Sequence, residues 1–451
     1  MKIRKDSDRR AIWGWALYDW ANSAFATTVM AGFFPIFFKA YWSYGSDVNV
    51  STAQLGLGNS LAGLIVALLG PVLGAISDRG NSRKKFLIFF AYLGVMMTAA
   101  LFVVHKGDWR LAILFYAVGI IGFSGANIFY DSLLPHIASE KNIDTVSGLG
   151  FSLGYLGGGL LFLLNVLMYL MPNRFGLPDQ IFAVRFAFLT VAAWWGFFTI
   201  FIILWVKEIT VSSSSSSTTG IIKSGFFQFT STFRKVKSLK TVFLFLIAYF
   251  LYIDGVDTIV RMAVDYGLSI GFGEKDLIIA LLLVQFVAFP AALFYSKLGE
   301  MWGVRKAIFL AIFIYMLITV GGIMMTDVTE FYLLAIGIGL VQGGIQALSR
   351  SYYARLIPTE QSGEFFGFYN MIGKFAVILG PALMGLVGLI AKSLLVREGM
   401  TAPEIEMVSH LASRWSIASI LILFIAGAVL FYFVDEEKGK KELQELEGMI
   451  D

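Results

Sequence analysis

The sequence predicts an all-α membrane protein with twelve transmembrane helices in two pseudo-symmetric six-helix bundles. Hydrophobic residues fill 57% of the 451 positions and charged residues only 15%, whereas a soluble domain carries roughly 25% charged residues. Charge-free apolar runs recur along the chain, for example at 86–104, 186–206 and 307–325. About 20 apolar residues are enough to cross a bilayer core roughly 30 Å thick. In addition, the two halves of the chain share a pattern of motifs.

The apolar runs place six helices in each half of the chain. In the first half they fall near 12–38, 55–76, 86–104, 111–133, 146–170 and 186–206. In the second half they fall near 241–262, 277–295, 307–325, 331–349, 365–391 and 415–434. We therefore expect an N-terminal bundle at 1–206, a C-terminal bundle at 241–435 and a cytoplasmic tail at 436–451.

The segment between the bundles, 207–240, is polar and basic and contains a run of serines at 212–217. A Ser/Thr tract cannot bury enough apolar surface to fold, so we expect a flexible cytoplasmic linker. The basic N-terminus resembles a signal peptide. However, the apolar run behind it is long and carries Asp19, which predicts a retained first helix.

Lys and Arg are distributed unevenly between the two sides of the predicted topology. With the N-terminus inside, the inner segments carry 24 of them and the outer loops carry 10. Cytoplasmic loops of membrane proteins are enriched in Lys and Arg. The bias therefore predicts that both termini and the linker lie in the cytoplasm, and that a bacterial cell would hold this multi-pass protein in its cytoplasmic membrane.

Paired motifs relate the two halves, as expected for a transporter built from repeats with its site at their interface. Each half has a carboxylate and a basic pair between its second and third helices, and carboxylate or amide residues in its first helix. The pairs are Asp78 with Arg83 and Lys84 against Glu300 with Arg305 and Lys306, and Asp19 with Asn22 against Asp254 with Asp257.

The stretch from Gly74 to Lys85, which reads Gly-Ala-Ile-Ser-Asp-Arg-Gly-Asn-Ser-Arg-Lys-Lys, resembles the signature loop of the major facilitator superfamily, Gly-x-x-x-Asp-Arg-x-Gly-Arg-Arg. Relative to that signature, the second glycine, Gly80, comes one place early, and the basic pair, Arg83 and Lys84, comes one place late. The resemblance implies the major facilitator fold and a gating role for this loop and its weaker second copy. The gating candidates are Gly74, Asp78, Arg79, Arg83, Glu300 and Arg305.

A narrower likeness lies in Tyr18-Asp-Trp-Ala-Asn-Ser-Ala24, Asp254-Gly-Val-Asp-Thr258, Phe365-Phe-Gly-Phe-Tyr369 and Gly380-Pro381. These stretches are similar to the vacuole-effluxer branch of that superfamily, which includes fungal vacuolar amino-acid exporters. The likeness covers nearly the whole chain. It implies a permease for a small solute, with amino acids as the substrate class that it suggests.

Charged and polar residues within the predicted helices are candidates for a site, because a charge at the bilayer centre costs from about 3 kcal/mol upward. Asp254, Asp257 and Arg261 share one helix face, and Gln342, Gln346 and Arg350 form another polar stripe. In the resembling superfamily, the first and fourth helices of each half line a central cavity. The predicted substrate-binding residues are Asn22, Asn127, Asp254, Asp257, Gln342 and Gln346.

Asp19 is the candidate proton carrier. It lies roughly 10 Å into the first span, at 1.5 Å per residue, and burial from water favours the neutral form of a carboxyl group. Lys374 could pair with it in one state and release it in another. The alternative, which stays open, is a permanent structural pair between Asp19 and a neighbour such as Lys374.

Other residue types limit the function. The chain has no Cys and only three His, far apart in sequence, so we expect no metal site. It also lacks the glycine-rich phosphate-binding loop that ATP hydrolysis needs. We expect no enzyme activity, no cofactor and no nucleic-acid partner, and a monomer in the lipid bilayer. The leading hypothesis is a facilitative or proton-coupled permease working by alternating access. The alternatives are an exporter of lipid or hydrophobic drug, and a sensor or scaffold without transport.

Overall fold

The structure is a computed structural model that describes residues 8–46, 48–208, 231–269, 272–397 and 399–448. Twelve helices among these residues are long and apolar enough to cross a membrane, as predicted. The first half contains α1 (Arg9–Ala24), α2 (Phe34–Phe37), α3 (Val48–Arg79), α4 (Arg83–Ala100), α5 (Trp109–Ile137), α6 (Ile143–Leu170) and α7 (Gln180–Trp205). The second half contains α9 (Lys240–Ser269), α10 (Glu274–Trp302), α11 (Val304–Met324), α12 (Val328–Leu356), α13 (Ser362–Leu395), α14 (Ala402–Ala418) and α15 (Ile420–Tyr432).

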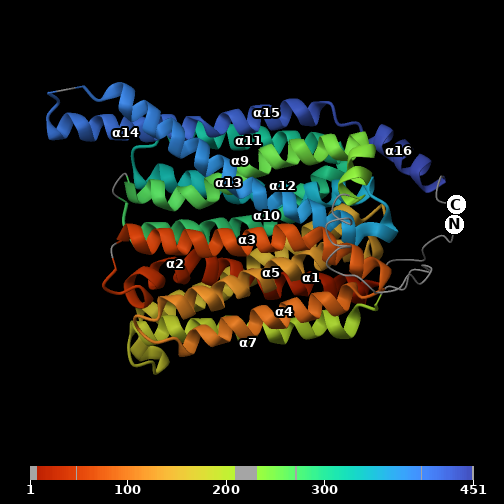
Figure 1. Cartoon of the computed structure of the whole chain (residues 1–451), viewed down its shortest axis with the longest axis horizontal. Coiled ribbons are helices and arrows are strands. Elements are labelled where there is room, and N and C mark those ends of the chain that lie inside the picture. The colour runs from red at the N-terminus through yellow and green to blue at the C-terminus, as the bar shows by residue number, and fades with distance from the viewer. Residues whose placement is uncertain (1–7, 47, 209–230, 270–271, 398, 449–451) are drawn as a thin grey trace.

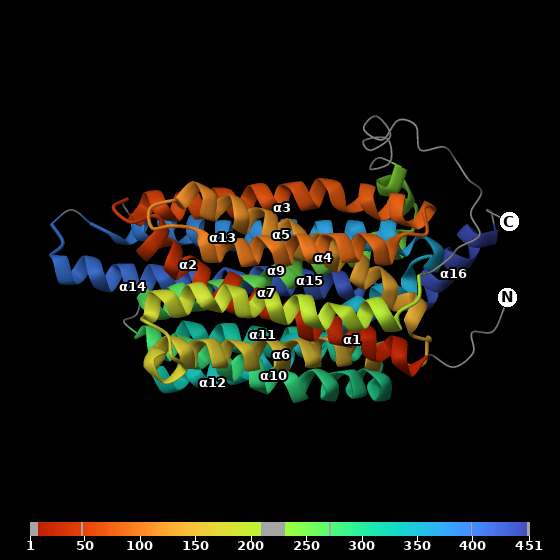
Figure 2. The same ribbon diagram turned by 90° about the horizontal axis from the view of Figure 1, so that it is seen from below.

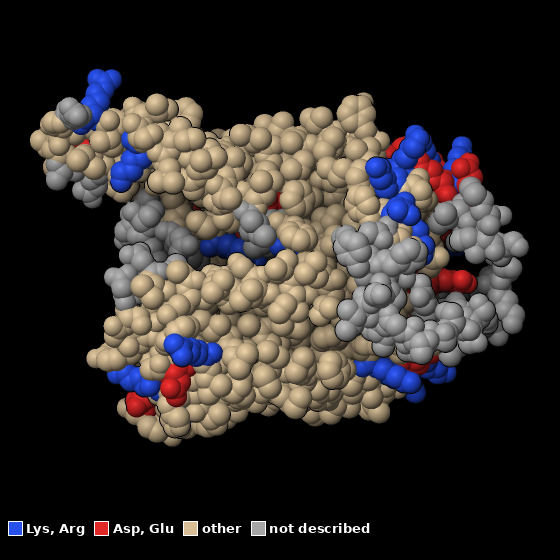
Figure 3. All heavy atoms as spheres, in the orientation of Figure 1, with Lys and Arg blue, Asp and Glu red and all other residues tan. Residues whose placement is uncertain are grey.

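The long helices lie side by side along one direction (Figure 1). We call the end at which α1 begins and α15 finishes the terminal end, and the other the far end. The tail helix α16 (Glu436–Gly448) follows α15 at the terminal end. Charged side chains gather at the two ends, while the surface between them on the face that Figure 3 shows is uncharged apart from a few charged side chains inside a hollow. This distribution suits a protein whose middle faces hydrocarbon.

The most extensive contacts between the halves are those of α3 with α13 and of α6 with α10, and α6 also touches α12 and α5 touches α13. Figure 2 shows the same bundle from a second side, with α10 and α6 adjacent. In a bilayer, helices associate through close packing and hydrogen bonds rather than through the hydrophobic effect. The contacts along these helix pairs therefore help to hold the halves together.

The first span is not a uniform α-helix. After α1 the chain turns through a π-helical stretch, η1 (Phe25–Phe33), then α2 and a second π-helical stretch, η2 (Phe38–Trp42). Pro35 at the start of α2 lacks a backbone N–H. Wider helical turns of this kind are frequent at functional sites, and Thr27 in η1 faces the cavity described below.

Several helices run further than the apolar runs predicted, among them α12, α13 and α14. Helix α12 continues to Leu356, past the predicted end at 349, and so takes Arg350 into the helix. Helix α13 ends at Leu395 and α14 begins at Ala402, so these two extend beyond the other helices at the far end (Figure 1). An apolar run marks only the part of a helix that lies in the hydrocarbon core. The helix itself can continue beyond the first charged residue, because its backbone hydrogen bonds do not depend on the side chains.

Candidate functional site

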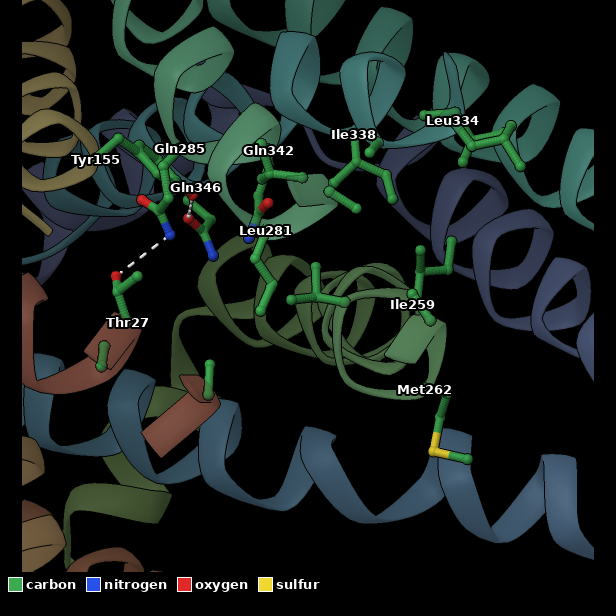
Figure 4. Close-up of a pocket in the computed structure, with 18 of the residues that line it drawn as sticks. Thr27, Tyr155, Ile259, Met262, Leu281, Gln285, Leu334, Ile338, Gln342 and Gln346 are labelled. Atoms are coloured by element: carbon green, nitrogen blue, oxygen red, sulfur yellow. Dashed lines mark hydrogen bonds between the residues drawn. The ribbon is translucent and has the colours of Figure 1, made fainter. Parts of the chain in front are cut away.

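A cavity of about 400 Å³ lies between the two halves and is lined by residues from both. Polar side chains gather toward one end, where Thr27, Tyr155, Gln285 and Gln346 come together (Figure 4). Apolar side chains line the rest, including Ile259, Met262, Leu281, Leu334 and Ile338. The cavity thus offers hydrogen bonds at one end and an apolar surface at the other.

Hydrogen bonds cross the polar end from one half to the other. The Gln285 amide donates to the Thr27 hydroxyl over 3.2 Å, and the Tyr155 hydroxyl donates to the Gln346 side chain over 2.9 Å (Figure 4). The side-chain oxygen of Gln342 is buried and accepts no hydrogen bond from the residues that the structure describes. Leaving such a group unpaired costs about 1–3 kcal/mol, so this oxygen is an available hydrogen-bond acceptor in the cavity.

Four of the predicted substrate residues line this cavity: Asn22, Asn127, Gln342 and Gln346. The Asn22 amide donates to Asn127 over 2.6 Å, which joins α1 to α5. The other two, Asp254 and Asp257, do not belong to the lining. Asp254 is fully buried and accepts a hydrogen bond from Thr258, one turn along α9, over 3.3 Å.

Next to the polar end, Arg350 of α12 enters a pocket formed entirely by the first half. Its guanidinium donates to Asp131 over 3.1 Å and lies 4.0 Å from a carboxylate oxygen of Asp19. It also donates to the hydroxyl and the backbone carbonyl of Ser147, over 3.0 and 2.9 Å. Only 3% of Arg350 is exposed, so the pocket replaces most of its hydration.

Aromatic rings complete this pocket. The guanidinium carbon lies 4.3 Å from the ring centre of Phe151, 4.8 Å from that of Trp15 and 5.3 Å from that of Tyr130. A cation within about 6 Å of an aromatic face is attracted by the ring quadrupole. We call Trp15, Asp19, Tyr130, Asp131, Ser147 and Phe151 the carboxylate pocket.

Asp19 lies where the carboxylate pocket meets the cavity. It lines the cavity and accepts hydrogen bonds from Tyr130 over 3.2 Å and from Ser23 over 3.4 Å. The predicted pairing with Lys374 is not seen in this state, in which the cation beside Asp19 is Arg350. Lys374 instead interacts electrostatically with Asp257 and Arg261. Sequence spacing could not show which helix of the second half faces α1.

A second set of contacts closes the terminal end. Asp78 pairs with Arg83 over 2.6 Å. It also accepts hydrogen bonds from the backbone N–H groups of Gly363 and Glu364, over 3.0 and 2.8 Å. These N–H groups belong to the first turn of α13, where the helix dipole favours a negative charge. Asp78 thus ties α3 of one half to the start of α13 in the other.

Glycines allow α3 and α13 to touch backbone to backbone beside Asp78. Gly70 and Gly74 on α3 face Gly367 and Gly363 on α13, respectively. A methyl group at Gly74 would overlap the carbonyl oxygen of Gly363, and one at Gly363 would come within 2.8 Å of the carbonyl oxygen of Gly74. We call these four residues the glycine seam.

The second copy of the loop makes a looser version of the same closure. Glu300, at the end of α10, accepts a hydrogen bond from Thr145 in the first turn of α6, and Arg355 pairs with Asp144. Arg305 was predicted to act with Glu300, but it donates to the carbonyl of Tyr432 and stays within its own half. The side chain of Arg79, also predicted to gate, lies outside the described residues.

Sequence reasoning left Arg350, Thr27, Tyr155 and Gln285 out of the predicted site. Arg350 belongs to the same polar stripe as Gln342 and Gln346, but the stripe alone gave it no role in the site. Gln285 is the one amide in an otherwise apolar run, which is a usable signal. Among the described residues, no group of three or more His, Asp or Glu side chains could hold a metal ion.

Comparisons with known proteins agree with this architecture. Residues 43–390 match the family model described as "Vacuole effluxer Atg22 like". An uncharacterized MFS-type transporter of Bacillus subtilis (strain 168), YxiO, is 39% identical over 425 residues, which cover 94% of each chain. Autophagy-related protein 22 of Eremothecium gossypii is 22% identical over 98% of this chain and 94% of its own.

Solved structures show the same fold at low sequence identity. The human organic anion transporter MFSD10 matches with a TM-score of 0.72 and 14% identity, over 95% of this chain and 100% of its own. The proton:xylose symporter XylE matches with a TM-score of 0.67 and 13% identity, over 97% of each chain. Sequence identities this low show a shared fold only, and this fold is the predicted major facilitator fold.

Proposed function

Because this chain belongs to the Atg22-like vacuole effluxer family of major facilitator transporters, we propose that it carries a small polar solute across its membrane by alternating access. The observation that carries the proposal is the cavity, which is lined by both halves and shut at the terminal end by contacts between them. Rocking of the two bundles, 1–206 and 241–435, would open that end and close the other. The segment 207–240 would link them.

The cavity supports a solute with hydrogen-bond donors and an apolar part. Asn22, Asn127, Gln342 and Gln346 supply amides at one end, and the aliphatic side chains supply the rest. Amino acids are the substrate class we propose. The apolar lining also favours the alternative of a lipid or hydrophobic-drug exporter, although that cargo would have little use for the amides and carboxylates.

Asp19 is the proposed site of proton coupling. It touches both the cavity and the cation of the opposite half, so its charge bears on solute binding and on closure together. When Arg350 withdraws with α12, a proton can replace that cation on Asp19. Lys374, which sits by Asp257 and Arg261, is at most an indirect participant.

The terminal end would be the cytoplasmic side, and the structure would then be the outward-facing state. Asp78, Gly74 and Arg83 form the main proposed gate, with Glu300 as its looser counterpart. We propose the cytoplasmic membrane as the location in a bacterium.

The proposed orientation is tested by reporter fusions. Alkaline phosphatase inserted within 207–240 is expected to be inactive, because the bias of 24 to 10 basic residues holds this segment in the cytoplasm. The same enzyme inserted within 171–180 is expected to be active. The opposite pair of results would invert the topology and the assignment of the gate.

The proposed site is tested by a thermal-shift screen of purified protein against amino acids, peptides and sugars, since a ligand of the native state raises its apparent stability. Gln342→Ala is expected to weaken binding of the best ligand by about 1 kcal/mol, or roughly fivefold in Kd, because it removes one hydrogen bond. Asp257→Ala reports whether α9 also contributes. Gln180→Ala, on the exposed start of α7, is the matched control. Unchanged affinity in a folded Gln342→Ala would place the site elsewhere.

A further inference from the structure

The carboxylate pocket is built like a binding site for a cation, although every part of it belongs to the first half and its present occupant belongs to the second. Two carboxylates, three aromatic rings and the oxygens of Ser147 surround one guanidinium group. Charge-assisted hydrogen bonds and aromatic faces are the contacts by which proteins hold organic cations. The pocket could therefore bind a cationic group of another molecule in the same way as it binds that of Arg350.

During alternating access, the Arg350 side chain must leave this pocket. Arg350 lies on α12 and reaches across to the first half, whose own backbone supplies Ser147 on α6 and Asp131 on α5. When the halves separate at the terminal end, Arg350 leaves with α12. Two carboxylates then remain beside three aromatic rings, next to newly admitted water. An isolated charge in such a place is unfavourable unless it is paired or neutralised.

We propose that the carboxylate pocket binds the cationic group of the transported solute, a primary ammonium or a guanidinium, and that Arg350 is its tethered competitor. This inference rests on the proposed transport function and adds a substrate class to it. The solute's cationic group would sit in the pocket while the terminal end is open. Closure would bring Arg350 back and displace the solute toward the cavity.

Asp131 and Asp19 make different contacts, and we therefore assign them different roles. Arg350 makes its closer ionic contact with Asp131, at 3.1 Å, and stays 4.0 Å from Asp19. Asn370 of α13 also donates to Asp131, over 3.0 Å, whereas Asp19 faces the cavity. Asp131 is therefore the counter-ion for the solute's cation, and Asp19 is left free for the proton. Phe151 lines both the pocket and the cavity, which gives a displaced solute a continuous path.

A chemical-rescue experiment on the full-length protein tests this proposal. Arg350→Ala leaves the pocket without its cation, and methylguanidinium is the probe that should replace it. We expect Arg350→Ala to have a lower apparent Tm than the parent and methylguanidinium to raise it with concentration, as a native-state ligand does. Choline, which lacks N–H donors, and potassium at the same ionic strength should not. Arg174→Ala, which removes an exposed arginine of the far end, should show no response to the probe.

Variants of the pocket locate the effect. Adding Asp131→Asn to Arg350→Ala should abolish the rescue, whereas adding Asp19→Asn should leave most of it. In the parent, Arg350 acts at the millimolar or higher effective concentration of a tethered group. The parent should therefore need more methylguanidinium than Arg350→Ala for any response.

A disulfide reporter keeps the proposal testable if Arg350→Ala fails to fold. The chain contains no Cys, so Thr145→Cys with Glu300→Cys gives a specific cross-link across the terminal end, where the two residues touch. Methylguanidinium should lower the yield of this cross-link in an otherwise parental protein. A folded Arg350→Ala that the probe stabilises no more than potassium would overturn the proposal, as would an unaffected cross-link where that variant does not fold.

These assays do not require transport, so the proposed cation site and the proposed transport function can be contradicted independently. Rescue without solute counterflow in proteoliposomes would remove the transport function and keep the cation pocket. Counterflow of a solute without rescue would keep transport and reduce Arg350 to a structural lock.

Discussion

Gly74→Ala is expected to prevent the terminal end from closing and to reduce transport by an order of magnitude or more. A methyl group on Gly74 would overlap the carbonyl oxygen of Gly363, whose backbone belongs to the other half. No side chain can move aside at this point, because both partners are backbone. Forcing extra atoms into a closely packed contact costs about 1–3 kcal/mol, and each 1.4 kcal/mol shifts a two-state equilibrium tenfold. The population should move toward the state in which α3 and α13 have separated.

The Thr145→Cys/Glu300→Cys cross-link measures this shift, and its yield should fall in Gly74→Ala. Gly367→Ala, which would meet the backbone of Gly70, should act in the same direction. Gly63→Ala on α3 and Gly385→Ala on α13 are matched controls, because a methyl group at either position meets nothing within 4 Å. If Gly74→Ala cross-links and transports like Gly63→Ala, the glycine seam does not set the closed state.

The sequence was sufficient for the architecture because that information is local. The number and order of spans follow from the length of apolar runs, and the fold follows from the repeated motifs, whose two copies lie on the corresponding loops after α3 and α10. Helix ends depend on more than hydropathy. Hydropathy stopped the tenth helix at 349, one residue before Arg350, which pairs with Asp131 of the first half.

Pairings between helices were beyond the sequence, since they depend on which faces meet. Gly70 and Gly74 lie four residues apart on α3, but their role depends on which residues of α13 they contact. Likewise, the sequence alone does not show whether Lys374 or Arg350 lies beside Asp19. The predicted amides fared better. Asn22, Asn127, Gln342 and Gln346 line one cavity, because polar side chains within apolar helices turn toward the interior.

Asp19→Asn is expected to abolish accumulation of solute against a gradient while sparing counterflow, if the carrier is driven by protons. Asn keeps the size of the protonated carboxyl group but can neither gain nor lose a proton. A pH difference of one unit supports at most about tenfold accumulation for one proton exchanged, since tenfold corresponds to 1.4 kcal/mol. In Asp19→Asn the accumulation ratio should fall to about one. Counterflow needs only exchange of solute for solute and should continue.

The surroundings of Asp19 make this separation of effects physically reasonable. The groups that face it are Arg350, Asp131, Tyr130 and Ser23, so its charge is felt chiefly by the single arginine from the opposite half. With Asp19 neutral, Arg350 keeps its pairing with Asp131 at 3.1 Å, and the terminal end can still close. With Asp19 ionised, the pocket holds one negative charge in excess whenever Arg350 is present, and two when it leaves. A proton on Asp19 therefore lowers the electrostatic barrier to opening, which is what coupling requires.

Asp108→Asn is the matched control for this substitution, because it makes the same isosteric change at an exposed position before α5 whose side chain caps no helix. Proteoliposomes with an imposed pH gradient and a radiolabelled solute from the binding screen provide the measurement. Accumulation driven by the pH gradient in Asp19→Asn at the level of Asp108→Asn would remove Asp19 from the coupling step. Asp254, its counterpart in α9 and fully buried, would then be the next carboxylate to substitute.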